Sequence, residues 1–94
     1  MARVLITGST AGLGRAAARN LLDEGHEVVL HARNSARAAS VDDLAGRAAG
    51  VVVGDLSSAD ETLGVADQAN AIGGIDAVIH NCGHLRGPSA GRNP

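Results

Sequence analysis

Short runs of apolar residues recur along the chain at nearly regular intervals. Four such runs lie at residues 4–6, 28–30, 51–53 and 77–79. Each contains only Val, Leu, Ile or Ala and is not interrupted by a polar residue. Their first residues lie 23 to 26 positions apart. Unbroken apolar strands of this kind are typical of a parallel sheet that is covered on both faces. We therefore predict four parallel strands at these positions.

The segments between the strands have the length and pattern of helices. Residues 14–24 place Ala and Leu side chains on one face at helical spacing, and Gly25 follows where a helix commonly ends. Residues from about 36 to 48 predict a second helix, which Ser40 and Gly46 weaken. Both segments can cover a face of the sheet.

A third helix is predicted to begin after Ser58, whose hydroxyl can accept a hydrogen bond from the amide of Glu61, and to close at Gly73 and Gly74. Strands and helices thus alternate, which calls for right-handed crossovers between parallel strands. The stretch from Gly87 onward reads as a loop. We expect one small α/β domain.

Composition narrows the class of protein. The 94 residues contain no Phe, Trp or Tyr, so the core must be built from aliphatic side chains. A formal net charge of -2 without a basic cluster argues against a nucleic-acid partner. The apolar run near the N-terminus is too short for a signal peptide or a membrane span. One cysteine forms no internal disulfide, and we expect a cytoplasmic protein that binds a small ligand.

A glycine-rich turn joins the first strand to the first helix and carries most of the chemistry. Residues 7–14 read TGSTAGLG. Glycines there let main-chain amides approach a phosphate, and the helix N-terminus adds a partial positive charge. The alternative is that the glycines serve only to make a tight turn. The spacing differs from G-x-G-x-x-G and lacks the G-K-[ST] of a P-loop, which excludes an NTPase of that type.

Three motifs together resemble those of the short-chain dehydrogenases/reductases. They are the TGSTAGLG turn, Gly54-Asp55-Leu56 after the third strand, and His80-Asn81-Cys82-Gly83 after the fourth. The resemblance runs from Arg3 to Gly83, and the last motif departs from the usual NNAG of the family. It implies a Rossmann-like three-layer sandwich with parallel sheet order 3-2-1-4, of which residues 1–83 form the NAD(P)-binding half and residues 84–94 a tail.

The resemblance also implies which residues bind the cofactor. Those of the glycine turn would hold the pyrophosphate and ribose, those after the third strand the adenine, and those after the fourth the nicotinamide ribose. The residues assigned on this basis are Gly8, Ser9, Thr10, Gly12, Leu13, Gly14, Asp55, Leu56, Asn81, Cys82 and Gly83.

The position of Asp55 in the sequence assigns it to the ligand site independently of the resemblance. It follows a parallel strand, at the sheet edge where folds of this class bind ligands. The alternative is that Asp55 caps the next helix, a role for which Ser57 and Ser58 compete.

The end of the second strand indicates which nicotinamide cofactor is preferred. An NAD site usually has a carboxylate there for the ribose 2′-hydroxyl, whereas this chain has Arg33 and Asn34. A guanidinium suits a 2′-phosphate, so we predict that NADP(H) is preferred over NAD(H). A solvated surface arginine is the alternative. Ala11 stands where NADP-binding relatives often have a basic residue.

Catalytic residues are not predicted within these residues. The family uses a Tyr and a Lys beyond the fourth strand for acid–base chemistry, and this chain contains neither. The chain is interpreted as the dinucleotide-binding part of a short-chain oxidoreductase. A non-catalytic nucleotide-binding or redox-sensing module and a truncated, inactive product are the alternatives. An open edge at the fourth strand predicts a homo-oligomer or pairing with another chain.

The stretch HNCGH at residues 80–84 is also a candidate metal site. His80, Cys82 and His84 are three potential ligands, and no fourth converges on them in the predicted topology. We therefore predict no metal, and interpret the stretch as a variant of the nicotinamide-side turn.

Overall fold

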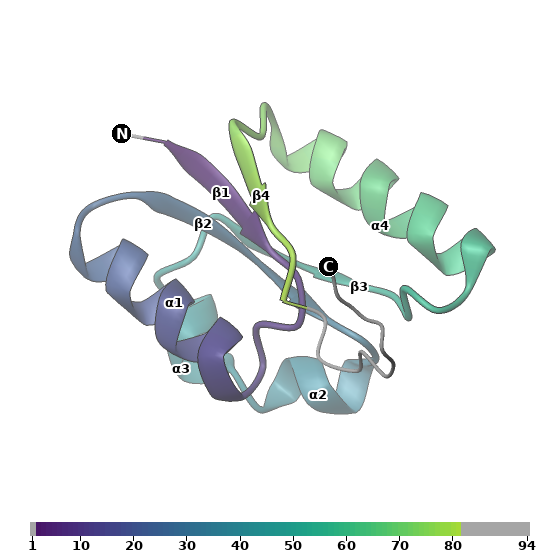
Figure 1. Ribbon diagram of the computed structural model, residues 1–94, viewed down its shortest axis with the longest axis horizontal. Helices are drawn as coiled ribbons and strands as arrows, with labels where there is room; N and C mark the ends of the chain where they lie inside the picture. Colours follow the sequence, from purple (N-terminus) through teal and green to yellow (C-terminus); the bar gives the residue numbers. More distant parts are fainter. Residues whose placement is uncertain (1, 82–94) are drawn as a thin grey trace, which may run out of the picture.

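The computed structural model describes residues 2–81 and forms three layers with a parallel sheet in the middle (Figure 1). The elements, in chain order, are β1 (Arg3–Ile6), α1 (Gly12–Asp23), β2 (Glu27–Ala32), α2 (Ser35–Ala39), α3 (Asp42–Ala45), β3 (Gly50–Val53), α4 (Ala59–Ile72) and β4 (Ala77–Ile79). The strand order is β3-β2-β1-β4 and every pair is parallel, which confirms the predicted Rossmann-like fold.

The two faces of the sheet are covered by different helices, as the strand order requires. Val4 and Ile6 of β1 point toward α1, whereas Leu5 between them points toward α4. The first core cluster joins alternate residues of β1 and β2 to α1 and to the segment around α3, and the second joins the opposite face to α4. Because aliphatic side chains alone fill both clusters, each layer of core is thin.

The first of these clusters is the larger. Its buried members are Val4, Ile6, Ala18, Leu22, Val28, Leu30, Val41 and Leu44, and those of the second are Leu5, Val29, Val52, Val65 and Ala69. Ile6 and Leu30 lie opposite each other in the register of β1 and β2 and are fully buried. The carboxyl ends of the central strands are thereby fixed in the middle of the molecule.

The predicted helix over residues 36–48 is wrong as a single element. It divides into α2 and α3, and Val41 between them turns inward and is fully buried. The hydroxyl of Ser40 donates to the carbonyl oxygen of Arg37 at 2.7 Å, so this side chain bonds to the backbone of the last turn of α2. The burial of Val41 then favours a break over a continuous helix.

The helix boundaries elsewhere follow the predicted signals closely. The hydroxyl of Ser58 accepts from the amide of Glu61 at 3.3 Å and caps α4, as predicted. The carboxylate of Glu61 accepts from the amide of Asp55 at 2.9 Å, which ties the loop after β3 to the first turn of α4. Helix α1 begins at Gly12, two residues earlier than predicted.

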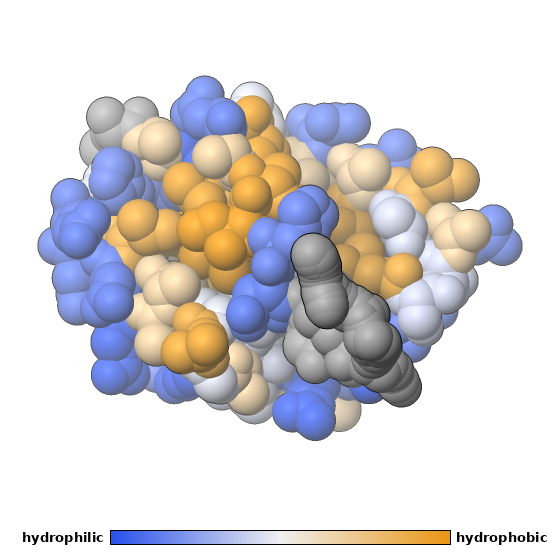
Figure 2. Space-filling model, viewed as in Figure 1, coloured by the Kyte–Doolittle hydropathy of each residue, from blue (hydrophilic) through white to orange (hydrophobic). Residues whose placement is uncertain are grey.

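Strand β4 lies at one edge of the sheet with its apolar side chains uncovered. It pairs with β1, and Val78 and Ile79 are 46% and 40% exposed. Figure 2 shows apolar side chains gathered on this face of the molecule, over β4 and beside α1. A strand of this composition is normally buried on both faces.

Two further predictions concern the ends of the chain and membranes. The predicted tail at residues 84–94 lies outside the described residues. Within residues 2–81, no helix is long and apolar enough to span a bilayer.

Candidate functional site

The loops that follow the four strands meet at the carboxyl edge of the sheet. The loop after β1 contacts the ends of β2 and β4, since the amide of Ser9 donates to the carbonyl of His31 and that of Thr7 to the carbonyl of Ile79. The loop after β3 contacts the end of β2, where Arg33 lies within 3.4 Å of Asp55. The structure thus brings the predicted site residues within 2–81 to one edge.

The glycine turn has the geometry of an anion-binding loop. Gly8 and Gly12 have φ angles of 64° and 61°, a region that favours glycine. Helix α1 follows with Ala11 at its N-cap, and within residues 2–81 no side chain caps its first turn. A helix N-terminus without a side-chain cap leaves its amides available to an anionic ligand. The residues present therefore fit the pyrophosphate of a dinucleotide.

Gly14 is a position where a side chain cannot be accommodated. A Cβ there would collide with the carbonyl oxygen of Gly8 and would lie 2.6 Å from Nδ2 of Asn81. Because the first of these contacts is with backbone, it cannot be relieved by a rotamer change. Gly14 therefore allows α1 to pack closely against the loops after β1 and β4.

Ser9 is turned inward rather than toward the sheet edge. Its side chain is fully buried, its hydroxyl accepts from the amide of His31 at 2.8 Å, and it also lies 3.2 Å from the His31 carbonyl oxygen. The imidazole of His31 in turn bonds to the amide of Gly8 and the carbonyl of Gly54. A role of the Ser9 side chain in cofactor binding stays a prediction.

Thr7 connects the glycine turn to the end of β4. Its hydroxyl lies 3.3 Å from the carbonyl oxygen of Ile79 and accepts from the amide of Asn81 at 2.8 Å. Thr7 is itself 3% exposed. These bonds place Asn81 beside Gly14, and its contact with a cofactor stays a prediction.

Asp55 is held as an ionised carboxylate in the turn after β3. The amide of Ser57 donates to it at 3.0 Å and the hydroxyl of Ser57 at 2.7 Å, and these bonds, with a smaller contribution from the charge of Arg33, hold the pKa of Asp55 below its usual value. Ser58, not Asp55, caps α4, so the capping alternative for Asp55 is wrong. One oxygen of Asp55 remains at the sheet edge near Arg33.

The lowered pKa of Asp55 predicts an acid-dependent stability contribution. A carboxyl whose pKa is lower in the folded chain stabilises the fold above its unfolded pKa, about 3.9, and loses that contribution as the pH falls through the folded value. Asp55→Asn is therefore expected to lower the midpoint of urea unfolding at pH 7 and to match the parent chain near pH 2. Asp67→Asn, at an exposed carboxylate of α4, serves as the control. An Asp55→Asn deficit that persists undiminished at pH 2 would contradict this reading.

The remaining predicted residues lie around these groups. Asn34 accepts from the amide of Arg37 at 2.9 Å and thereby caps α2. Leu56 is partly buried and packs against the core beneath α4. Thr10 is half-buried, and Leu13 is 82% exposed beside the glycine turn. Leu13 is thus free to contact a ligand.

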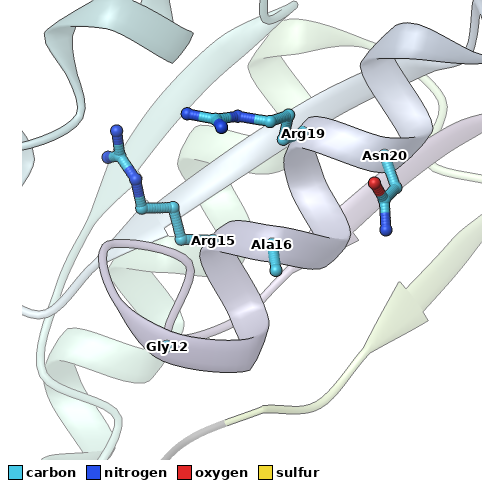
Figure 3. Close-up of a pocket in the computed structure, with 5 residues that line it drawn as sticks. All are labelled: Gly12, Arg15, Ala16, Arg19 and Asn20. Atoms are coloured by element: carbon cyan, nitrogen blue, oxygen red, sulfur yellow. The ribbon is translucent and has the colours of Figure 1, made fainter.

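A hollow on the outer surface of α1 is separate from this arrangement (Figure 3). Its lining consists of Gly12, Arg15, Ala16, Arg19 and Asn20, of which Gly12 alone is a predicted cofactor residue. The guanidinium of Arg15 is already engaged, 2.7 Å from a carboxylate oxygen of Asp43. The hollow is therefore not the predicted dinucleotide site.

Some predicted positions are not placed, and two contributing residues were missed. Cys82 and Gly83 lie outside the described residues, as does His84, which was considered as a metal ligand. No group of three or more metal-ligating side chains occurs within residues 2–81. Thr7 and His31 were not predicted to be site residues, because their partners are far away in the sequence.

Comparisons with known proteins agree with this geometry. The family model for short chain dehydrogenases matches residues 2–92. Short-chain dehydrogenases chry4 of Gibberella zeae and chyC of Penicillium rubens are each 56% identical over 88 residues, which cover 94% of this chain and 34% of either protein. A gluconate 5-dehydrogenase from Burkholderia cenocepacia, solved in complex with NADP and tartrate, superposes with a TM-score of 0.76 at 34% identity, covering 90% of this chain and 35% of that one. The chain spans about a third of the length of these proteins.

Proposed function

Because this chain belongs to the short-chain dehydrogenase family, we propose that it forms the dinucleotide-binding part of an NADP(H)-dependent oxidoreductase. The observation that carries the proposal is the uncapped N-terminus of α1 beside the glycine turn, at the carboxyl edge of a parallel sheet. The Burkholderia gluconate 5-dehydrogenase of similar fold is described with NADP bound, which supports the choice of cofactor.

Each part of the sheet edge then has a role in binding. The amides at the start of α1 would hold the pyrophosphate, and Asp55 and Leu56 would flank the adenine. Asn81 would meet the ribose on the nicotinamide side. The nicotinamide, when bound, donates or accepts a hydride. The residues described here bind and orient, and the acid–base groups of the reaction would come from elsewhere in the protein, since the chain has no Tyr or Lys.

Arg33 is the residue proposed to select the 2′-phosphate. Its side chain is 58% exposed, and its contact with Asp55 is long, at 3.4 Å. A surface ion pair of this kind contributes little, about 0–1 kcal/mol, so a phosphate can compete with it for the guanidinium. Arg33 can therefore turn from Asp55 to the cofactor without a large cost in stability.

Substitution of Arg33 tests the proposed cofactor preference. Arg33→Ala is expected to weaken NADPH binding by about tenfold to a hundredfold, because a hydrogen bond to a charged group contributes about 1.5–3 kcal/mol. NADH binding should change by less than about threefold, since NADH lacks the 2′-phosphate. Fluorescence titration of both cofactors provides the dissociation constants. Arg37→Ala, an exposed arginine of α2, is the matched control.

This titration tests which of the two cofactors is preferred, and does not test whether the protein binds a dinucleotide. If the unmodified protein binds NADH as tightly as NADPH or more tightly, NADP(H) is not the preferred cofactor. If Arg33→Ala weakens both cofactors equally, Arg33 is not the group that distinguishes them.

A further inference from the structure

His31 occupies a buried position between two loops of the proposed cofactor site. It is 2% exposed and lies near the end of β2. Its Nδ1 is 2.9 Å from the amide nitrogen of Gly8, and its Nε2 is 2.7 Å from the carbonyl oxygen of Gly54. The amide of Gly8 is a donor, so Nδ1 must accept. The carbonyl of Gly54 is an acceptor, so Nε2 must carry the proton. Both bonds require the neutral Nε2–H imidazole.

We propose that His31 is a positioning residue for the dinucleotide site, and that its neutral imidazole holds the glycine turn in the conformation that binds the cofactor. The inference rests on the proposed function.

The imidazole acts on the glycine turn through the peptide groups of Gly8. The amide of Gly8 is bonded to His31, and its carbonyl oxygen lies where a Cβ of Gly14 would collide. The orientation of Gly8 therefore determines how closely the start of α1 approaches the sheet edge. Release of the amide would let the turn shift relative to the amides of α1, which are the proposed pyrophosphate ligands.

The same imidazole reaches the adenine side of the site. Gly54, whose carbonyl accepts from Nε2, directly precedes Asp55. Gly54 is buried, and a Cβ on it would lie 2.6 Å from Val65 and 2.9 Å from the carbonyl oxygen of Glu61. The loop after β3 is thus pressed between α4 and His31. One side chain couples the loops proposed to bind the two ends of the adenosine diphosphate.

Within residues 2–81, the ionisable side chains on the elements next to His31 form no hydrogen bond with its imidazole. Arg33 on the loop after β2 pairs with Asp55, and Asp55 accepts from Ser57. Glu61 of α4 accepts from the amide of Asp55, and His80 follows β4, on the far side of β1 from β2. Among the described residues, the hydrogen bonds of the imidazole are with main-chain groups, so the imidazole acts on the two loops directly.

The test measures NADPH dissociation constants at pH 8 on the intact protein as its gene encodes it. His31→Gln offers an amide acceptor and donor, and should bind within about fivefold of the unmodified protein. His31→Leu offers neither and should bind at least about tenfold more weakly. His26→Gln is the control. His26 also accepts a hydrogen bond from a main-chain amide, that of Ala2, but lies at the opposite end of the sheet.

The comparison of the two variants separates the hydrogen-bond acceptor from the bulk of the side chain. At pH 8 the dissociation constant of His31→Leu should exceed that of His31→Gln. If His31→Leu binds NADPH as tightly as the unmodified protein, or if His31→Gln binds as weakly as His31→Leu, the inference is overturned while the proposed function stays intact.

Nuclear magnetic resonance of the imidazole nitrogens supplies a readout that needs no cofactor. The unmodified protein should show the Nε2–H tautomer at pH 8, with a coupling across the hydrogen bond between Nδ1 and the amide of Gly8. The other tautomer, or the absence of that coupling, would overturn the inference even if a variant failed to fold. Absence of NADPH and NADH binding by folded protein at pH 8 would instead overturn the proposed function.

Discussion

Gly14→Ala is expected to reduce dinucleotide affinity by at least about a hundredfold, which corresponds to about 2.7 kcal/mol. The added Cβ would strike the carbonyl oxygen of Gly8 and lie 2.6 Å from Nδ2 of Asn81. Backbone must move to relieve the first contact, so α1 would shift away from the glycine turn. The amides proposed to bind the pyrophosphate would then no longer converge. Calorimetric titration of NADPH into the variant measures the loss.

The matched control is Gly64→Ala in α4. A Cβ on Gly64 meets nothing within 4 Å. Alanine is favoured over glycine in a helix by about 1 kcal/mol, so this variant should be at least as stable as the parent and bind NADPH equally well. If Gly14→Ala retains affinity within a few-fold of the parent while remaining folded, the close approach at Gly14 does not serve binding.

The isolated polypeptide of residues 1–94 is expected to self-associate through β4. Val78 and Ile79 project from a three-residue edge strand and are 46% and 40% exposed. An uncovered apolar edge strand is a template for pairing with another chain. The relatives are about three times as long, and we propose that in the complete protein further chain covers this edge. Without that cover, the thermal midpoint should rise with protein concentration.

Val78→Lys tests whether β4 is the surface responsible. A lysine on an edge strand discourages strand pairing, so the variant should sediment as a monomer at concentrations where the parent polypeptide forms dimers or larger species. Leu63→Lys is the control, because Leu63 of α4 is 66% exposed and lies away from the edge. A parent polypeptide with a sharp thermal transition independent of concentration would contradict the prediction, as would equal effects of both substitutions.

The sheet could be predicted from the sequence because its signals are local. Unbroken runs such as residues 51–53 mark strands that are covered on both faces, and their regular spacing leaves room for one crossover helix each. The N-cap of α4 could also be predicted from the sequence, because Ser58 and Glu61 are only three residues apart. The strand order, by contrast, came from the family resemblance rather than from the pattern.

Features that depend on contacts between distant segments were not predictable. The break between α2 and α3 follows from the burial of Val41 against the core, which a helical pattern does not reveal. His31 bonds to residues 23 positions away on either side, and nothing in its immediate neighbours marks it as a link between loops.

The most direct test of the central claim is calorimetric titration of NADPH into the intact protein. The proposed function predicts one molecule bound per chain, with NADPH bound more tightly than NADH and binding abolished by Gly14→Ala. A folded protein that binds neither cofactor would contradict it.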